Sequence, residues 1–181
     1  MSSDQRLDSS AIAGRARTLA CVLVLALGST AGDLAQAQVL MQPNISVAQA
    51  RLIVDTIIAQ CSASEDLVTV TIAVVDRAGI PVIQVRADTA SPHNWELAYR
   101  KAYTARTFRR TSISWRDRTA GDSPLIGQRE LSNTVPLGGG APIMMGDVPV
   151  GGVGVSGSSG GQEGDTACAE AGIAAIADQL E

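Results

Sequence analysis

The segment VPVGGVGVSGSSGGQEGD, residues 148–165, decides between two folds. Its glycines at Gly152, Gly154 and Gly157 match the G-x-G-x-x-G pattern of dinucleotide-binding proteins. In that fold the glycine turn opens a helix inside a strand-helix-strand unit. Here the polar stretch 158–165 follows the glycines and only one further helix is expected, so no parallel strand can follow. The segment instead predicts a glycine-rich strand that lets backbones approach closely, and then a loop whose amides could cover an anionic ligand.

The rest of the chain alternates between helical and strand patterns. Apolar residues recur with the helical period after Ser46, which suits an N-cap, and Ser91 and Pro92 have the residue types of a helix start. This order predicts an α/β protein of the α+β type, with a single antiparallel sheet of about five strands, flanking helices and no second domain. Residues 67–76 are nearly all apolar after the first few, which predicts a buried central strand. The other expected elements are a helix at 46–61, a strand at 80–86 that follows the central strand after a tight turn, a helix at 91–110, a mostly irregular excursion at 111–134, strands at 141–145 and 148–156, and a helix from about Glu163 to Asp178.

The first 37 residues have the features of an export signal. Arg15 and Arg17 precede the apolar run TLACVLVLALG, which is too short for a permanent membrane helix, and the AQA sequence at 35–37 fits a cleavage site. We therefore expect a signal peptide at 1–37 and a mature domain at 38–181 that is periplasmic or secreted, without a membrane span. The signal holds three basic and three acidic residues, so the net charge stays at −4, which disfavours general nucleic-acid binding.

Two cysteines, Cys61 and Cys168, remain after removal of the signal, which takes Cys21 with it. In an oxidising compartment they can form one disulfide between the first and last predicted helices. The alternative is a pair of unbridged, buried thiols. We favour the bridge because exported free thiols are a liability. It would close a loop of more than a hundred residues, and loop-closure entropy then predicts roughly 4–5 kcal/mol of stabilisation.

Basic residues cluster on and after the second predicted helix. Such a run is usually a solvated helix face. It could also line a pocket for carboxylates or phosphates, because Trp95, Tyr99 and Tyr103 are interleaved with the cations and are three of the chain's five aromatic residues. Both interpretations are open on the sequence alone. The clustered residues are Arg100, Lys101, Arg106, Arg109, Arg110, Arg116 and Arg118.

His93, the only histidine, would be the second residue of that helix. The positive end of the helix dipole disfavours imidazolium, so we expect a neutral ring, the form that binds a metal or haem iron. By helical spacing, one face of the helix carries this imidazole, an apolar side chain and cations, and a planar cofactor could lie along it. The alternative is a surface residue beside a helix start. No metal-ligand cluster, Cys-x-x-Cys or G-x-S-x-G motif indicates a catalytic residue. The residues of the face are His93, Leu97, Arg100 or Lys101, and Thr104.

Six motifs occur in the order found in a family of haem-binding proteins. They are AVVDRAG (73–79), RADTA (86–90), RKAYTARTF (100–108), GGGAPI (138–143), VGGVGVSG (150–157) and DTACAEAGIAAI (165–176). On these motifs the chain resembles the GlcG/HbpS family from about Ile45 to its C-terminus. The resemblance implies a profilin-like fold, haem or related tetrapyrrole binding, and homo-oligomers, some of them exported. The sequence departs from the family at two places. Thr89 stands where a glycine is common in relatives, and the loop at 157–165 is polar and anionic.

The resemblance also implies roles for single residues. A histidine ahead of the KAYTA helix is the expected axial ligand, and His93 takes that place. Arg100 and Lys101 would bind the haem propionates, and Tyr103 and Thr104 complete the predicted haem site. The second axial ligand would be Met, Tyr, Lys, Thr, water or a group from another subunit.

The function implied by the resemblance is that of an exported haem-binding protein, in haem sensing, storage or handling, with a sensor or redox protein as partner. Two alternatives remain open. One is slow haem degradation, the only enzymatic activity that the resemblance suggests. The other is a cofactor-free accessory subunit of a periplasmic oxidation pathway.

Overall fold

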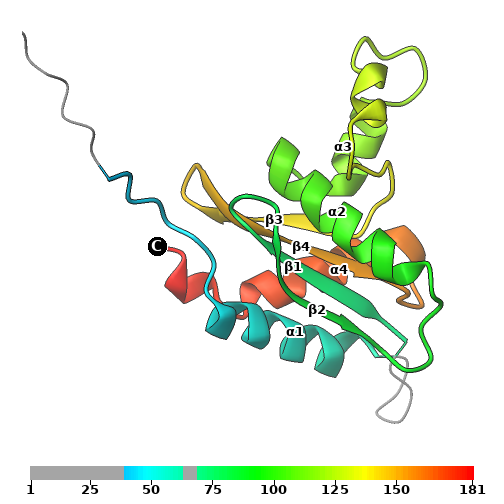
Figure 1. Cartoon of the computed structure of the whole chain (residues 1–181). Coiled ribbons are helices and arrows are strands. Elements are labelled where there is room, and N and C mark those ends of the chain that lie inside the picture. Colours follow the sequence, from blue (N-terminus) through cyan, green and yellow to red (C-terminus); the bar gives the residue numbers. More distant parts are fainter. Residues whose placement is uncertain (1–38, 63–68) are drawn as a thin grey trace, which may run out of the picture. The chain divides into compact units, whose positions relative to one another are not determined.

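The structure is a computed structural model that describes residues 39–62 and 69–181 (Figure 1). The folded domain is the compact unit Met41–Glu181. The predicted signal peptide at 1–37 lies outside the described residues. Within the described part of the chain, no helix is long and apolar enough to cross a membrane.

Four antiparallel strands form one sheet in the described part of the chain, in the order β2-β1-β4-β3. Two hairpins make up this sheet and meet along β1 and β4, where Ala73 is paired with Gly154. The antiparallel sheet of an α+β protein is therefore confirmed. It has four strands rather than about five, because the chain after residue 134 forms two strands and no third. The strands are β1 (Thr71–Asp76), β2 (Pro81–Arg86), β3 (Gly140–Met145) and β4 (Val148–Ser156).

Helices cover both faces of the sheet. α1 (Val47–Cys61) and α4 (Gly161–Ala174) pack side by side on one face, and α2 (Asn94–Phe108) lies on the other (Figure 1). The last helix was expected to reach Asp178. It ends instead at Ala174, and the short 3-10 turn η2 (Ala177–Gln179) follows. The sheet therefore has a helix-pair side and a single-helix side.

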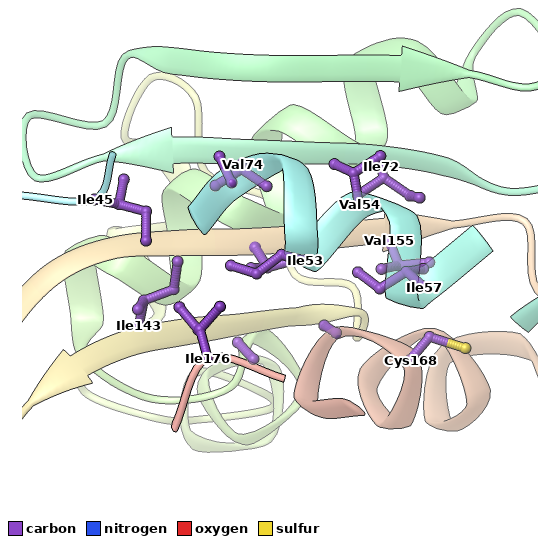
Figure 2. Packing of buried hydrophobic residues seen from close by; sticks show 14 of the residues in the cluster. Ile45, Ile53, Val54, Ile57, Ile72, Val74, Ile143, Val155, Cys168 and Ile176 are labelled. Carbon is purple, nitrogen blue, oxygen red and sulfur yellow. The ribbon is translucent and has the colours of Figure 1, made fainter. Parts of the chain in front are cut away.

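The larger core fills the space between the sheet and the pair α1 and α4. Ile53 and Ile57 of α1 belong to one buried cluster with Ile72 of β1, Ile143 of β3 and Val155 of β4 (Figure 2). Complete burial of such a side chain contributes about 1.5–3 kcal/mol. This cluster therefore provides most of the apolar burial that holds the layers together.

The strand β1 is covered on both sides. Ile72 and Val74 belong to the larger core, whereas Ala73 and Val75 face a smaller core under α2. All residues from Thr71 to Val75 are buried as a result. The nearly continuous apolar run in the sequence, which predicted a central strand, is explained by this double cover.

The two ends of α1 are fixed by local chemistry. Ser46 is its N-cap, as predicted: the Ser46 hydroxyl accepts the Gln49 N–H at 3.2 Å, and the Gln49 side chain accepts the Ser46 N–H at 3.0 Å. At the other end, a disulfide joins Cys61 to Cys168 of α4, with the Cα atoms 6.0 Å apart. The bridge ties together the two helices of this layer.

The helix α2 begins later than the sequence suggested. The predicted N-cap at Ser91 is wrong, because residues 91–93 form a turn in which the Asn94 N–H donates to the Ser91 carbonyl at 3.0 Å. His93 is the N-cap instead. Asn94 is buried, and its side-chain oxygen accepts the Ser156 hydroxyl at 3.1 Å. This hydrogen bond fixes the first turn of α2 against the end of β4.

The predicted irregular excursion at 111–134 is partly helical. It contains α3 (Ser112–Arg118) and the 3-10 turn η1 (Ile126–Glu130). Trp115 of α3 is 1% exposed and stacks on Phe108, with ring centroids 4.8 Å apart. One buried aromatic side chain therefore anchors the segment, a contact that hydrophobic periodicity does not reveal.

The disulfide gives a stability prediction. The double variant Cys61→Ser/Cys168→Ser should lose roughly 4 kcal/mol of unfolding free energy, because it loses a cross-link between residues far apart in the chain. Urea denaturation at neutral pH measures the difference, and reduced wild-type protein should show the same loss. Equal denaturation midpoints for the oxidised wild type and the double variant would contradict a stabilising bridge.

Candidate functional site

The helix α2 lies with its backbone directly on the strands beneath it. A Cβ atom at Gly154 of β4 would lie 2.0 Å from the Ala98 carbonyl oxygen, and one at Gly140 of β3 would lie 2.1 Å from the Lys101 carbonyl oxygen. Only glycine allows so close an approach. On the helix side, the residues turned to the sheet are small and fully buried; they are Ala98, Ala102 and Ala105.

The contact between α2 and the sheet encloses the only lysine of the chain. Lys101 is 3% exposed, and its Nζ donates to Asp165 Oδ2 of α4 at 2.8 Å. The same ammonium donates to the Val155 carbonyl at 3.0 Å and to the Ser156 hydroxyl at 3.4 Å. Asp165 Oδ1 accepts the Ser158 N–H at 2.9 Å. All three ammonium protons have acceptors, so the buried ion pair links α2 to β4 and α4.

Two of the predicted haem contacts have a structural role in this arrangement. A propionate could reach the Lys101 ammonium only by replacing Asp165, because the ammonium is buried against it. Thr104 is also fully buried. Its hydroxyl donates to the Arg100 carbonyl at 2.7 Å and accepts the Val135 N–H at 3.0 Å. Lys101 and Thr104 therefore bind neighbouring parts of the protein to α2, and neither side chain faces an external ligand.

Arg100 lies at the accessible edge of α2. Its Nε donates to the Thr134 carbonyl at 3.1 Å, and its Nη1 donates to Glu96 Oε1 at 3.0 Å. The bond to Thr134, which Nη2 shares, fastens the segment after η1 to the helix, whereas the bond to Glu96 lies within α2. The Arg100 side chain is 33% exposed, and a guanidinium has five N–H donors in a rigid fork. Three of these donors are engaged, two by the Thr134 carbonyl and one by Glu96, and two remain for an external carboxylate.

His93 is exposed at the N-cap of α2 and makes no side-chain capping hydrogen bond. Arg100 lies two turns further along nearly the same side of the helix, about 10 Å along the axis. Beyond it, Thr104 is covered by the segment around Val135. The structure thus keeps His93 and Arg100 together on one accessible flank of α2, which we call the His93 flank.

The two tyrosines of α2 lie on another side of the helix. Tyr99 and Tyr103 have ring centroids 6.0 Å apart. The Tyr103 ring covers Gly79 in the β1–β2 turn, where a Cβ atom would lie 2.7 Å from Tyr103 Cε2. Burial, and secondarily the neighbouring Tyr103, raise the pKa of the Tyr99 phenol, which stays protonated at neutral pH. Tyr103 therefore does not belong to the His93 flank, and the aromatic residues and His93 do not form one pocket.

The clustered cations also separate in space. Lys101 is buried in its ion pair, Arg100 lies on the His93 flank, and Arg116 pairs with its neighbour Asp117 at 2.8 Å on the surface. Arg106 lines a cavity near the far end of α2. The described residues include no group of three or more His, Cys, Asp or Glu side chains that could hold a metal ion.

The part of this network that the sequence did not reveal is Asp165, the partner of Lys101. A signal for the burial of Lys101 existed, because helical spacing places this residue beside Ala98 and Ala102 on a face suited to close packing. The partner itself lies 64 residues further along the chain. Local patterns cannot identify a contact of that separation.

A family model described as "Haem degrading protein HbpS-like" matches residues 45–174 of the chain. The chain belongs to the HbpS-like family. The family assignment covers the sheet, the helices α1 to α3 and the whole of α4, and it includes every residue of the His93 flank. A comparison with curated proteins gives no match.

Solved structures of the HbpS-like family share the fold. The chain is similar to HbpS, with 28% identity and a TM-score of 0.69 over 77% of this chain and 94% of HbpS. It matches a double mutant of Streptomyces reticuli HbpS at 27% identity and a TM-score of 0.69, over 76% of this chain and 90% of that one. A third match is the PduOC:heme complex, at 26% identity and a TM-score of 0.63, over 74% of this chain and 95% of that one.

The buried ion pair gives a second prediction. Asp165→Asn should lower the free energy of unfolding by about 3–5 kcal/mol, because the Lys101 ammonium would stay buried without a counter-charge. The double variant Lys101→Met/Asp165→Leu should recover much of this loss. Asp117→Asn, in the exposed pair with Arg116, serves as a control and should change stability by at most about 1 kcal/mol. Chemical denaturation measures all three, and wild-type stability in Asp165→Asn would rule out the structural role of the pair.

Proposed function

We propose that the protein binds haem, or a related tetrapyrrole, with His93 as an axial ligand of the iron and Arg100 as the partner of a propionate. The observation that supports this most directly is the exposed imidazole of His93 at the start of α2, in a chain of the HbpS-like family. A relative of similar fold, PduOC, has been solved as a heme complex. Imidazole is among the side chains that bind haem iron in proteins.

The residues of the His93 flank suit such a ligand. The His93 ring has no capping hydrogen bond to give up. Arg100 lies about 10 Å further along the helix, on the same side, with its side chain partly exposed. Bound haem would supply the redox-active iron, and this chain would supply one axial nitrogen and one cation. Compared with the site expected from the sequence, Lys101, Tyr103 and Thr104 are no longer included.

Haem on an open flank needs a cover. His93 contributes to one side of the iron only, so we propose that a second subunit of a homo-oligomer covers the opposite side and supplies the other axial position. We further propose an exported protein that handles, stores or senses haem outside the cytoplasm, with a sensor or redox protein as partner. The export signal in the sequence and the disulfide between Cys61 and Cys168 support this location.

Slow haem degradation is a second candidate function, because the family model is described as haem degrading. Among the described residues near the His93 flank, Glu96 is the one carboxylate that could act as an acid or base, and it is bound to Arg100. Any such activity would therefore depend on the bound haem and an added oxidant such as peroxide. Faster loss of the Soret band than in free hemin, together with release of iron, would distinguish degradation from storage.

Hemin added to the purified protein should shift the Soret band, and His93→Ala should weaken haem affinity at least tenfold, because the bond between iron and imidazole is lost. Arg100→Gln should weaken affinity by a smaller factor. Arg118→Gln, an exposed arginine of α3, is the matched control and should bind like the wild type. An unchanged spectrum and affinity in His93→Ala would remove His93 from the site.

A further inference from the structure

A cavity of about 380 Å³ lies near the end of α2 that is remote from His93. Three parts of the chain form it: the β1–β2 turn, the C-terminal half of α2 and the segment that precedes α1. The residues that line it are Gln42, Asn44, Asp76, Arg77, Ala78 and Arg106. All of them belong to the folded domain.

Two arginines that line this cavity have no paired carboxylate among the described residues. Neither Arg77 nor Arg106 is in an ion pair with a described residue. The Nε atom of Arg106 is buried and has no hydrogen-bond acceptor, and Arg77 Nη1 makes only a long contact with the Pro149 carbonyl, at 3.4 Å.

The carboxylate in the cavity wall does not neutralise both arginines. Asp76 Oδ1 accepts the Ala78 N–H at 2.8 Å and the Ile80 N–H at 2.9 Å, so this oxygen holds the β1–β2 turn. Asn44 is oriented in a similar way, because its side-chain oxygen accepts the Arg77 N–H at 2.8 Å. The amide nitrogen of Asn44 is thereby left as a further donor. The lining therefore has an excess of donors and of positive charge.

The charges around Arg106 are also mostly positive. Burial, followed by the charges of Arg77 and Arg109, lowers the pKa of Arg106, while Asp76 and Tyr103 act in the opposite direction. Arginine remains charged at neutral pH in proteins. Like charges that are held together beside a cavity attract an anion.

This cavity is separate from the proposed haem site. Arg106 follows His93 by thirteen residues, which corresponds to ~20 Å along α2 and to an angle of about 140° around its axis. One haem bound to the His93 imidazole cannot extend its own propionates over that distance and around the helix. A ligand in the cavity must therefore be a different molecule.

We propose that this cavity binds a small oxyanion, either a phosphate or a carboxylate group, between the guanidinium groups of Arg77 and Arg106. A guanidinium presents paired N–H donors that match the two oxygens of such a group. The proposal rests on the cavity and its two arginines and does not depend on haem binding.

Calorimetric titration at low salt, with inorganic phosphate and separately with malonate, tests the proposal on the whole protein. The wild type should bind at least one of these anions saturably, and the tighter one identifies the ligand chemistry. Arg106→Gln and Arg77→Gln should each weaken binding at least tenfold, whereas Arg106→Lys should lie in between because it keeps the charge without the fork. Arg118→Gln should bind like the wild type. Absence of saturable binding of either anion would overturn the proposal, as would wild-type affinity in Arg106→Gln.

A spectroscopic measurement on the wild type covers the case in which Arg106→Gln does not fold. The side-chain N–H resonances of Arg106 should shift on titration with the anion, since the anion binds its guanidinium, and those of Arg118 should not. An unshifted Arg106 resonance would overturn the proposal. Arg106→Gln should bind haem with the same affinity as the wild type. A tenfold loss of haem affinity in this variant would show that the cavity belongs to the haem site instead.

Discussion

The close contact between the backbone of α2 and the glycines of β3 and β4 is the constraint on which the rest of the domain depends. A Cβ atom at Gly154 or Gly140 would lie only 2.0 Å or 2.1 Å from a carbonyl oxygen of the helix. The helix face must therefore be made of alanines, and the single lysine on that face must find its counter-charge inside the protein. Asp165 provides it, and so the position of α2 on one face of the sheet is coupled to the position of α4 on the other.

This constraint also determines what α2 can offer to ligands. Because one side of the helix is committed to the sheet, only its remaining sides are open to ligands. The His93 flank carries an imidazole and a partly exposed arginine, whereas the opposite flank carries two neighbouring tyrosines and, at its far end, the cavity between Arg77 and Arg106. The two flanks suit chemically different ligands, an iron macrocycle and a small oxyanion. A single helix thus supports two separate proposed sites in a family that is described by haem chemistry.

Much of the fold is predictable from local patterns, and much of the site is not. The antiparallel sheet, the cap at Ser46 and the central position of β1 follow from residue types and periods over a few residues. The start of α2 was misplaced because Ser91 and Pro92 have the residue types of a helix start, whereas the buried contact of Asn94 with β4 decides it. The pairing of Lys101 with Asp165, and the convergence of Arg77 with Arg106, depend on elements distant in sequence.

Chemical denaturation of a Gly154→Ala variant tests the central constraint most directly. The added Cβ atom would lie 2.0 Å from the Ala98 carbonyl oxygen, and we predict a loss of at least about 3 kcal/mol in the free energy of unfolding, at the upper end for overpacked cores. Gly127→Ala is the matched control, because no heavy atom lies within 4 Å of its added Cβ. A Gly154→Ala protein as stable as the Gly127→Ala control would contradict the account.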